Sequence, residues 1–258
     1  MKISAVIIAG NEESKIADAI LSVEWADEVL VIDSESVDRT VEIATSMGAR
    51  VISRPWPGFS AQKQFGVDSA KFDWIFSLDA DERVSPELAS EIKNIRDKAG
   101  GPAFSGYRIP RSSFYMGRQI RHSGWYPDWQ LRLFDRRKGH WNDLIVHESV
   151  RLNDGESVGR LRSDIIHFTI DDASEHHRLI GERYAPLAAQ QMFERGRRTS
   201  LLRLTTAGSV AFLTSFIVKG GFLDGLPGYC IARFAGHHAF LKHLLLWELQ
   251  NEIPRGHS

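Results

Sequence analysis

Strand-like and helix-like segments alternate through the first hundred residues, and this alternation restricts the fold more than any other feature. Ile3–Ala9, Glu28–Ile32 and Trp74–Leu78 are short apolar runs with the length of buried strands. Segments with helical spacing separate them, and Ser85-Pro86 opens a further helix with a capping serine and a proline in the first turn. Because strands that alternate with helices build right-handed βαβ units, the sequence predicts an α/β domain with a mostly parallel sheet.

The composition excludes several classes of protein. Of 258 residues, 43% are hydrophobic and 25% are charged, so the chain can bury a core of ordinary size. A formal net charge of −1 gives no reason to expect a nucleic-acid partner. Cys230 is the only cysteine, which excludes a disulfide framework and is typical of a reducing compartment. We find no apolar stretch approaching the roughly 18–20 residues that span a membrane, so we expect a soluble or peripheral protein.

Acidic residues follow two of the expected strands. Asp79-Ala80-Asp81 closes the run Trp74–Leu78, at the carboxyl end of a strand, where α/β sheets bind ligands. Two carboxylates this close repel each other unless a cation lies between or beside them, and Mg²⁺ takes one or two carboxylates together with phosphates. Asp33 ends the second strand and can accept hydrogen bonds from a nucleotide. The alternatives are an acidic turn before the helix at Pro86 and, for Asp33, a cap of the following helix.

Three motifs in the first half carry a family resemblance. Ile7–Glu12, Val31–Thr40 and Leu78–Glu82 resemble, in order and spacing, the family-2 glycosyltransferases, which have the GT-A fold, a nucleotide-binding αβα sandwich. Lys63–Gly66 stands where many members have Arg-Asn-x-Gly. The resemblance implies a GT-A domain over residues 1–175 and a helical extension over 176–258. It implies a nucleotide-sugar donor bound by Ala9, Asn11, Glu12, Asp33, Lys63, Asp79, Ala80, Gln130 and Arg132, with Mg²⁺ or Mn²⁺ held by Asp79, Asp81 and His167.

Motifs in the second half are similar to a narrower group. Trp125–Phe134, Val146–Glu148 and Gly220–Gly225 are similar to segments of bacterial lipopolysaccharide core glucosyltransferases. This resemblance implies inverting transfer of a sugar, glucose from a UDP donor, to a hydroxyl of a glycolipid or core oligosaccharide. Such a transfer needs a neutralised diphosphate, an aligned anomeric carbon and a general base.

The general base and the acceptor cleft are both expected in the second half. Asp128 and Glu148 are the two candidates for the base, and the sequence does not choose between them. For each, the alternative is a structural pair with a nearby arginine. The aromatic residues around Asp128 can stack on sugar rings or can be core residues. As acceptor-binding residues we expect Trp125, Tyr126, Trp129 and His147.

The C-terminal region combines basic and apolar residues. Arg195, Arg197, Arg198 and Arg203 precede the apolar stretch Ala207–Val218. Basic residues beside an apolar helix are typical of segments that lie in an anionic membrane interface. We therefore expect peripheral contact with the inner face of a bacterial cytoplasmic membrane. The alternatives are a helical subdomain packed on the first domain and the interface of a homo-oligomer.

Other classes of protein fit the sequence less well. A sugar-phosphate nucleotidyltransferase has a glycine-rich basic loop after its first strand, where this chain has the acidic segment Gly10–Ser14. A dinucleotide-dependent oxidoreductase needs a Gly-x-Gly-x-x-Gly motif after a strand, and none is present. A catalytically silent module that binds a nucleotide sugar would share the fold, and the retained acidic motif argues against it.

Overall fold

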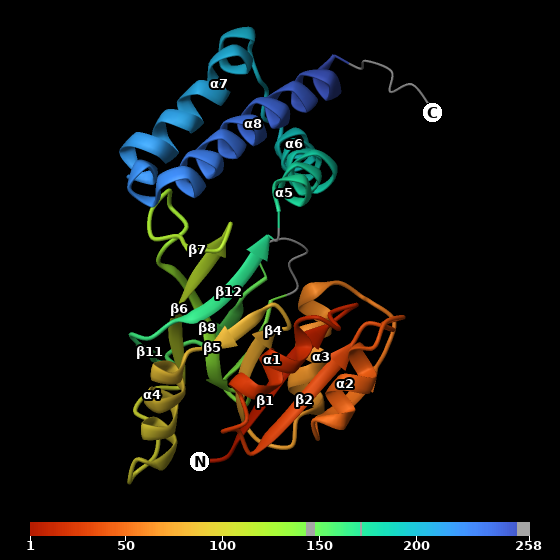
Figure 1. Ribbon diagram of the computed structural model, residues 1–258, viewed down its shortest axis with the longest axis vertical. Coiled ribbons are helices and arrows are strands. Elements are labelled where there is room, and N and C mark those ends of the chain that lie inside the picture. Colours follow the sequence, from red (N-terminus) through yellow and green to blue (C-terminus); the bar gives the residue numbers. More distant parts are fainter. Residues whose placement is uncertain (143–147, 171, 252–258) are drawn as a thin grey trace. The chain divides into compact units, whose positions relative to one another are not determined.

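The computed structural model describes residues 1–142, 148–170 and 172–251 (Figure 1). The chain forms two compact units. Unit 1 contains Met1–Ser112 and Pro127–Phe168, and unit 2 contains Ser113–Tyr126 and Thr169–Ser258. The domain division expected between residues 175 and 176 stays a prediction.

Most strands join one sheet with the order β3-β2-β1-β4-β8-β6-β12-β5. The first four strands in this order run parallel, whereas β8 runs antiparallel to β4 and β6 antiparallel to β8. The α/β sandwich predicted from the alternating pattern is confirmed. The strands are β1 Ile3–Ala9, β2 Glu28–Asp33, β3 Arg50–Ser53, β4 Trp74–Asp79, β5 Glu82–Val84, β6 Gly106–Tyr115, β7 Arg118–Gln119, β8 Asp128–Asp135, β9 Gly139–Trp141, β10 Val150–Leu152, β11 Val158–Arg160 and β12 Ile165–Ile170.

Both faces of the sheet in unit 1 are buried, as β1 shows most directly. Ile3, Ala5, Ile7 and Ala9 of β1 belong to one apolar cluster, which also includes residues of α1, α2 and α4. The residues between them, Val6 and Ile8, belong to a second cluster with Val67 of α3 and residues of the β9–β10 hairpin. This alternation has the period of two that a strand imposes, so helices cover both faces. The helices of unit 1 are α1 Ile16–Ser22, α2 Thr40–Ser46, α3 Phe59–Ser69 and α4 Pro86–Asp97.

The register of the parallel strands places the acidic motifs at one edge of the sheet. Ile8 of β1 pairs with Asp79 at the end of β4, and Ala9 pairs with Asp33 at the end of β2. The carboxyl ends of β1, β2 and β4 therefore lie side by side, at the edge where α/β sheets bind ligands.

Unit 2 is helical around a small core of its own. The sequence predicts a helical region from Asp172 to about Glu194, and the structure has one there, with a π-helical segment, η1, in its middle. Tyr115, Ile120 and Ile231 are among the buried residues that form the core. The helices are α5 Ala173–Leu179, η1 Ile180–Tyr184, α6 Ala185–Glu194, α7 Leu201–Leu213, η2 Thr214–Val218, η3 Gly221–Asp224 and α8 Gly225–Gln250.

One helical segment of unit 2 corrects a conclusion from the sequence. Leu201–Val218, which joins α7 to η2, is long and apolar enough to cross a membrane by length and composition, with a mean hydropathy of 1.6. The expectation that no such stretch exists is therefore wrong. That expectation assumed a continuous apolar run, whereas this segment is interrupted by Arg203 and by threonine, serine and glycine, and is apolar only as an average over its length.

Candidate active site

A cavity of about 510 Å³ opens at the carboxyl ends of β1 and β4. Five of the nine predicted donor-binding residues line it: Ala9, Asn11, Glu12, Asp79 and Ala80. All three predicted metal ligands line it, because Asp81 and His167 do so together with Asp79. The structure thus brings residues of all three sequence motifs together around one space, with Ser34 from the second motif. The other lining residues are Ile8, Gly10, Ser34, Trp56 and Phe59.

Hydrogen bonds fix the loops at the rim of this cavity. Asn11 has a left-handed backbone (φ 57°), its N–H donates to Ser36 Oγ (2.8 Å), and its Oδ1 accepts from the N–H of Val37 (2.9 Å). Asp33 is buried and accepts from the N–H of Ser36 (3.1 Å). Asp33 therefore supports the loop after β2, and it is not among the residues that line the cavity. Its predicted contact with the nucleotide stays a prediction.

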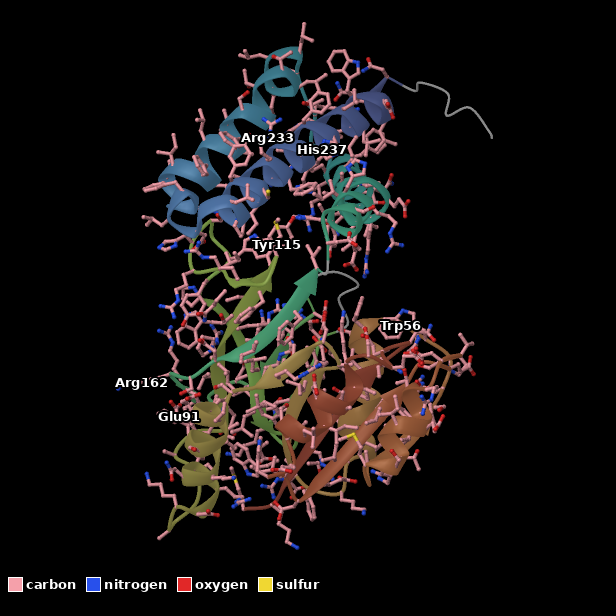
Figure 2. All side chains as sticks on the ribbon, viewed as in Figure 1. Trp56, Glu91, Tyr115, Arg162, Arg233 and His237 are labelled. Carbon is pink, nitrogen blue, oxygen red and sulfur yellow. The ribbon has the colours of Figure 1, made fainter. Side chains whose placement is uncertain are left out.

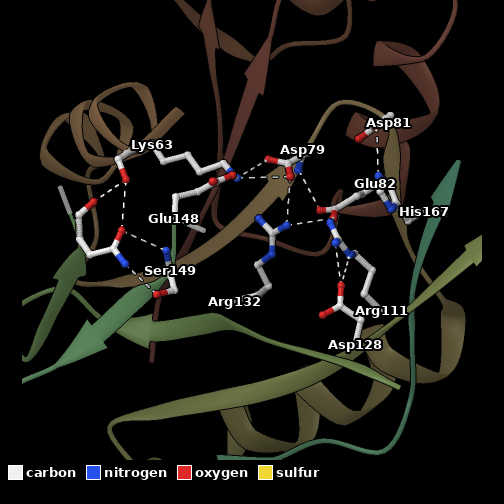
Figure 3. A network of polar contacts seen from close by, with 12 residues as sticks. Lys63, Asp79, Asp81, Glu82, Arg111, Asp128, Arg132, Glu148, Ser149 and His167 are labelled. Atoms are coloured by element: carbon white, nitrogen blue, oxygen red, sulfur yellow. Dashed lines mark hydrogen bonds and ion pairs between the residues drawn. The ribbon is translucent and has the colours of Figure 1, made fainter. Parts of the chain in front are cut away.

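Asp79 is held by two basic residues from other elements (Figure 3). Its Oδ2 accepts from Arg132 Nη2 of β8 (3.0 Å), and its Oδ1 lies 3.0 Å from Lys63 Nζ of α3 in an ion pair. Burial by itself would raise the pKa of the Asp79 carboxyl, but the charges of Arg132 and Lys63 outweigh burial and hold that pKa well below its ordinary value. Neither Arg132 nor Lys63 lines the cavity, so both influence it through their contacts with Asp79.

Glu82 and Arg111 complete this network, and the sequence analysis assigned neither of them a role. Glu82 is fully buried and accepts from Arg132 Nη2 (2.9 Å), from Arg111 Nη1 (3.2 Å) and, through its Oε2, from the N–H of Asp79 (3.0 Å). Glu82 therefore holds the turn between β4 and β5 in place through these hydrogen bonds. The signal for Glu82 was its place at the end of the motif Leu78–Glu82, whereas Arg111 carries no local signal.

Asp81 and His167 face each other across the cavity wall. Asp81 Oδ2 and His167 Nε2 lie 3.2 Å apart, and the N–H of Phe168 donates to the carbonyl oxygen of Asp81 (3.0 Å). The pairing of β12 with β5 brings these distant residues together, because His167 pairs with Glu82 in the register. Within the described residues, no group of three or more His, Cys, Asp or Glu side chains is arranged to hold a metal ion.

The two candidate bases have different surroundings in unit 1. Asp128 Oδ2 accepts from Arg111 Nε (2.9 Å) and Nη2 (2.6 Å), and its Oδ1 accepts from Gln130 Nε2 (2.7 Å). Glu148 lies 3.6 Å from Lys63 Nζ, and its side chain is 25% exposed. Both oxygens of Asp128 are therefore engaged, whereas Glu148 makes a longer contact, with the cation of Lys63, among the residues that the structure describes.

The expected acceptor residues fall into both units. Trp129 is in unit 1, where the Arg160 guanidinium lies 5.2 Å from its ring centroid. Trp125 and Tyr126 are in unit 2, and Trp125 packs edge-on against Tyr115 at 5.9 Å as part of the core of that unit. His147 lies outside the described residues. An aromatic residue that the sequence analysis missed, Trp56, lines the cavity and is 46% exposed.

Comparison with known proteins gives the family. The model of glycosyl transferase family 2 matches residues 4–154, more than half of the chain. The chain therefore belongs to glycosyl transferase family 2, and the expectation of an enzyme, a hexosyltransferase of this family, is confirmed.

Alignments with similar proteins cover almost the whole chain. An uncharacterized glycosyltransferase of Rickettsia typhi is 32% identical over 261 residues, covering 96% of this chain and 87% of the relative. The lipopolysaccharide core biosynthesis glycosyltransferase LpsC of Rhizobium meliloti is 29% identical over 255 residues, covering 96% and 93%. The crystal structure of S. aureus TarS 1–349 superposes with a TM-score of 0.50 at 12% identity, covering 100% and 93%, which supports the GT-A fold. The predicted resemblance to lipopolysaccharide core enzymes is thus confirmed.

Proposed function

We propose that this protein transfers a hexose, glucose by its resemblance, from a UDP-sugar to a hydroxyl of a lipopolysaccharide core or a related glycolipid, with inversion at the anomeric carbon. The observation that carries the proposal is the cavity at the carboxyl ends of β1 and β4, where Asp79, Asp81 and His167 meet the loop after β1. The acceptor class is supported by the similarity to LpsC, whose name describes lipopolysaccharide core biosynthesis.

A divalent cation, Mg²⁺ or Mn²⁺, fits Asp81 and His167. Their facing oxygen and nitrogen atoms supply two donors beside a cavity of about 510 Å³, which has room for phosphate oxygens as further ligands. Asp79 is a weaker candidate for a ligand because Lys63 and Arg132 already neutralise its carboxylate. When bound, the cation would act as a Lewis acid that neutralises the diphosphate leaving group.

The basic residues around Asp79 act as positioning residues in this proposal. Arg132 and Lys63 hold the Asp79 carboxylate, and Glu82 accepts a hydrogen bond from the N–H of Asp79. Ala80 packs into the core beside them. The turn after β4 is therefore anchored on several sides, which fixes the direction in which Asp81 points. A site held in this way loses little free energy to reorganisation when the donor binds.

Glu148 is the general base that these contacts favour. A base must be able to receive the proton of the attacking hydroxyl, so it needs a free oxygen and access to the acceptor. Glu148 is partly exposed with one contact to Lys63, whereas Asp128 is engaged by Arg111 and Gln130. In this proposal Asp128 orients Arg111, which in turn contacts Glu82.

The site assignment is tested by calorimetric titration of UDP in the presence of Mn²⁺ and again with chelator. Asp81→Asn and His167→Gln should each weaken the metal-dependent binding by at least about tenfold, since even partners of metal ligands contribute that much. Asp128→Asn is the matched control, because it changes a carboxylate in the same network without touching the proposed ligands. An Asp81→Asn variant that keeps the wild-type affinity for UDP in Mn²⁺ would contradict the assignment.

We propose that the enzyme works at the cytoplasmic face of the inner membrane, as expected from the sequence. The segment Leu201–Val218 supports this proposal, because it is apolar and only 6% of it is buried. A glycolipid acceptor is anchored in the bilayer, so an enzyme that touches the membrane would meet its acceptor at high local concentration.

A further inference from the structure

Unit 2 exposes several large apolar side chains. No residue of α7 is buried, and the segment Leu201–Val218 that extends it is 6% buried. We name the exposed apolar residues of α7, η2 and the start of α8 the apolar face: Leu202, Val210, Leu213, Ile217, Val218 and Leu226, each between 49% and 79% exposed. Surfaces of this kind on soluble proteins mark sites of contact with proteins or membranes.

A groove runs between α7 and α8, which lie beside each other (Figure 1). The two helices approach closely at their glycines, because a Cβ atom on Gly236 would lie 2.8 Å from the carbonyl oxygen of Gly208. The groove next to this contact has a volume of about 540 Å³. Phe212 and Phe240 supply apolar walls, and Arg233 and His237 of α8, labelled in Figure 2, supply basic groups.

Arg233 is a cation without a counter-ion in this groove. Its guanidinium carbon lies 5.8 Å from the ring centroid of Phe212, and no carboxylate of the described residues pairs with it. The surrounding chain is basic, since residues 195–251 contain seven Lys and Arg against two Asp and Glu. One of those two acids, Asp224, is buried and paired with His122. The stretch that contains α7 and α8 therefore has a net positive charge, which favours an anionic ligand.

We propose that the groove between α7 and α8 binds the phosphate headgroup of an anionic phospholipid, with the apolar face lying in the interface of the bilayer. Arg233 supplies a planar, bidentate donor for the phosphate, which is the usual role of arginine at such groups. The apolar residues beside it would enter the boundary between headgroups and acyl chains, as amphipathic helices do. This assignment deepens the proposed function and rests on it for its purpose, because the acceptor is a glycolipid in the same membrane.

The ionisable residues of α8 favour a position of α7 and α8 at the membrane interface over one in which the two helices cross the bilayer. α8 runs beside α7 and carries His237, His238, Lys242 and His243 along its middle and second half. A pair of helices that crossed the bilayer would take these groups into the hydrocarbon region, where ionisable side chains are costly. A second copy of the chain is also a poor occupant of the apolar face, because it would bring the same excess of basic residues against the first.

The proposal is tested by flotation of the full-length protein with vesicles of phosphatidylcholine alone and of phosphatidylcholine mixed with phosphatidylglycerol. The wild type should float with the anionic vesicles and far less with the neutral ones. Arg233→Gln should weaken this partition by at least about tenfold, because about tenfold is the effect of losing even one of the two hydrogen bonds to a charged group. Arg178→Gln, which removes the same charge from α5 outside the groove, should remain close to the wild type. Unchanged melting temperatures of both variants would show that they fold.

Three results would overturn the proposal. The first is an absence of binding to anionic vesicles, and the second is an equal loss for Arg233→Gln and Arg178→Gln, which would indicate diffuse charge. The third is a rise in melting temperature with inorganic phosphate that Arg233→Gln abolishes while no vesicle binding occurs, which would assign the groove to a soluble phosphate. Because the assay contains no donor or acceptor, its outcome is independent of whether the proposed glycosyl transfer is correct.

Discussion

Replacing Arg132 with methionine tests whether the buried network under the cavity holds the site together. Arg132 is 2% exposed and forms ion pairs with Asp79 (3.0 Å) and with Glu82 (2.9 Å), of which Glu82 is fully buried. Removing one partner of a buried ion pair costs about 3–5 kcal/mol, because the remaining charge is left in a poorly solvated place. Since Asp79 keeps Lys63 and Glu82 keeps Arg111, we expect a loss of stability near the lower limit, about 3 kcal/mol.

The assay is thermal unfolding followed by circular dichroism at neutral pH. A loss of about 3 kcal/mol corresponds to a decrease in Tm of roughly 6–12 °C for a domain of this size. Arg39→Met is the matched control. Arg39 pairs with Glu42 at 3.1 Å, close to the distances of both Arg132 pairs, but the two side chains are 69% and 67% exposed. Ion pairs between exposed side chains contribute little, so its Tm should stay close to that of the wild type. Equal decreases for the two variants would refute the argument that burial, rather than distance, determines the contribution.

Three further predictions concern the general base, the stability of the fold at acid pH and the packing of the sheet. Glu148→Gln should lower kcat by about 10²–10⁴ with little change in KM, and Asp128→Asn should cost less; the reverse order in steady-state kinetics would exchange their roles. Because the folded pKa of Asp79 is depressed, its contribution is present above its ordinary value of 3.8 and is lost as the pH falls below it, so the urea midpoint should drop below about pH 4. A flat urea midpoint across this range would contradict the depressed pKa. Gly66→Ala should lower the free energy of unfolding by about 1–3 kcal/mol, because the added Cβ would lie 2.5 Å from Val6 Cγ1. A Tm equal to that of the wild type would show that the sheet shifts to make room for the methyl group.

The fold of unit 1 could be predicted because its signals are local. The run Ile3–Ala9 became β1 with the same bounds. Parallel strands buried on both faces appear in a sequence as short continuous apolar runs. Other strands have a weaker local signal: the sequence indicates a strand from Gly106 to Pro110, whereas β6 extends to Tyr115. Pro110 sits within this strand opposite Trp129, where the pairing with β8 decides the structure.

The candidate site could be predicted only where sequence neighbours are also neighbours in space. Asp79 and Asp81 were identified from a single motif at a strand end. The partners that neutralise Asp79 come from α3 and β8, and Arg111 comes from β6, so no local pattern relates them. The exposure of the apolar face of unit 2 could not be predicted for a different reason. The exposed fraction of a helix depends on the elements that pack against it, which a local pattern does not show.

The proposed glycosyl transfer is tested by measuring the release of free nucleoside diphosphate from a panel of UDP-, GDP-, ADP- and dTDP-sugars, with Mn²⁺ or Mg²⁺ and again with chelator. We predict slow turnover of one UDP-hexose that requires the metal and is abolished by Asp81→Asn. No turnover of any sugar donor, with no metal-dependent binding of UDP, would contradict it and would favour a catalytically silent binding module on the same fold.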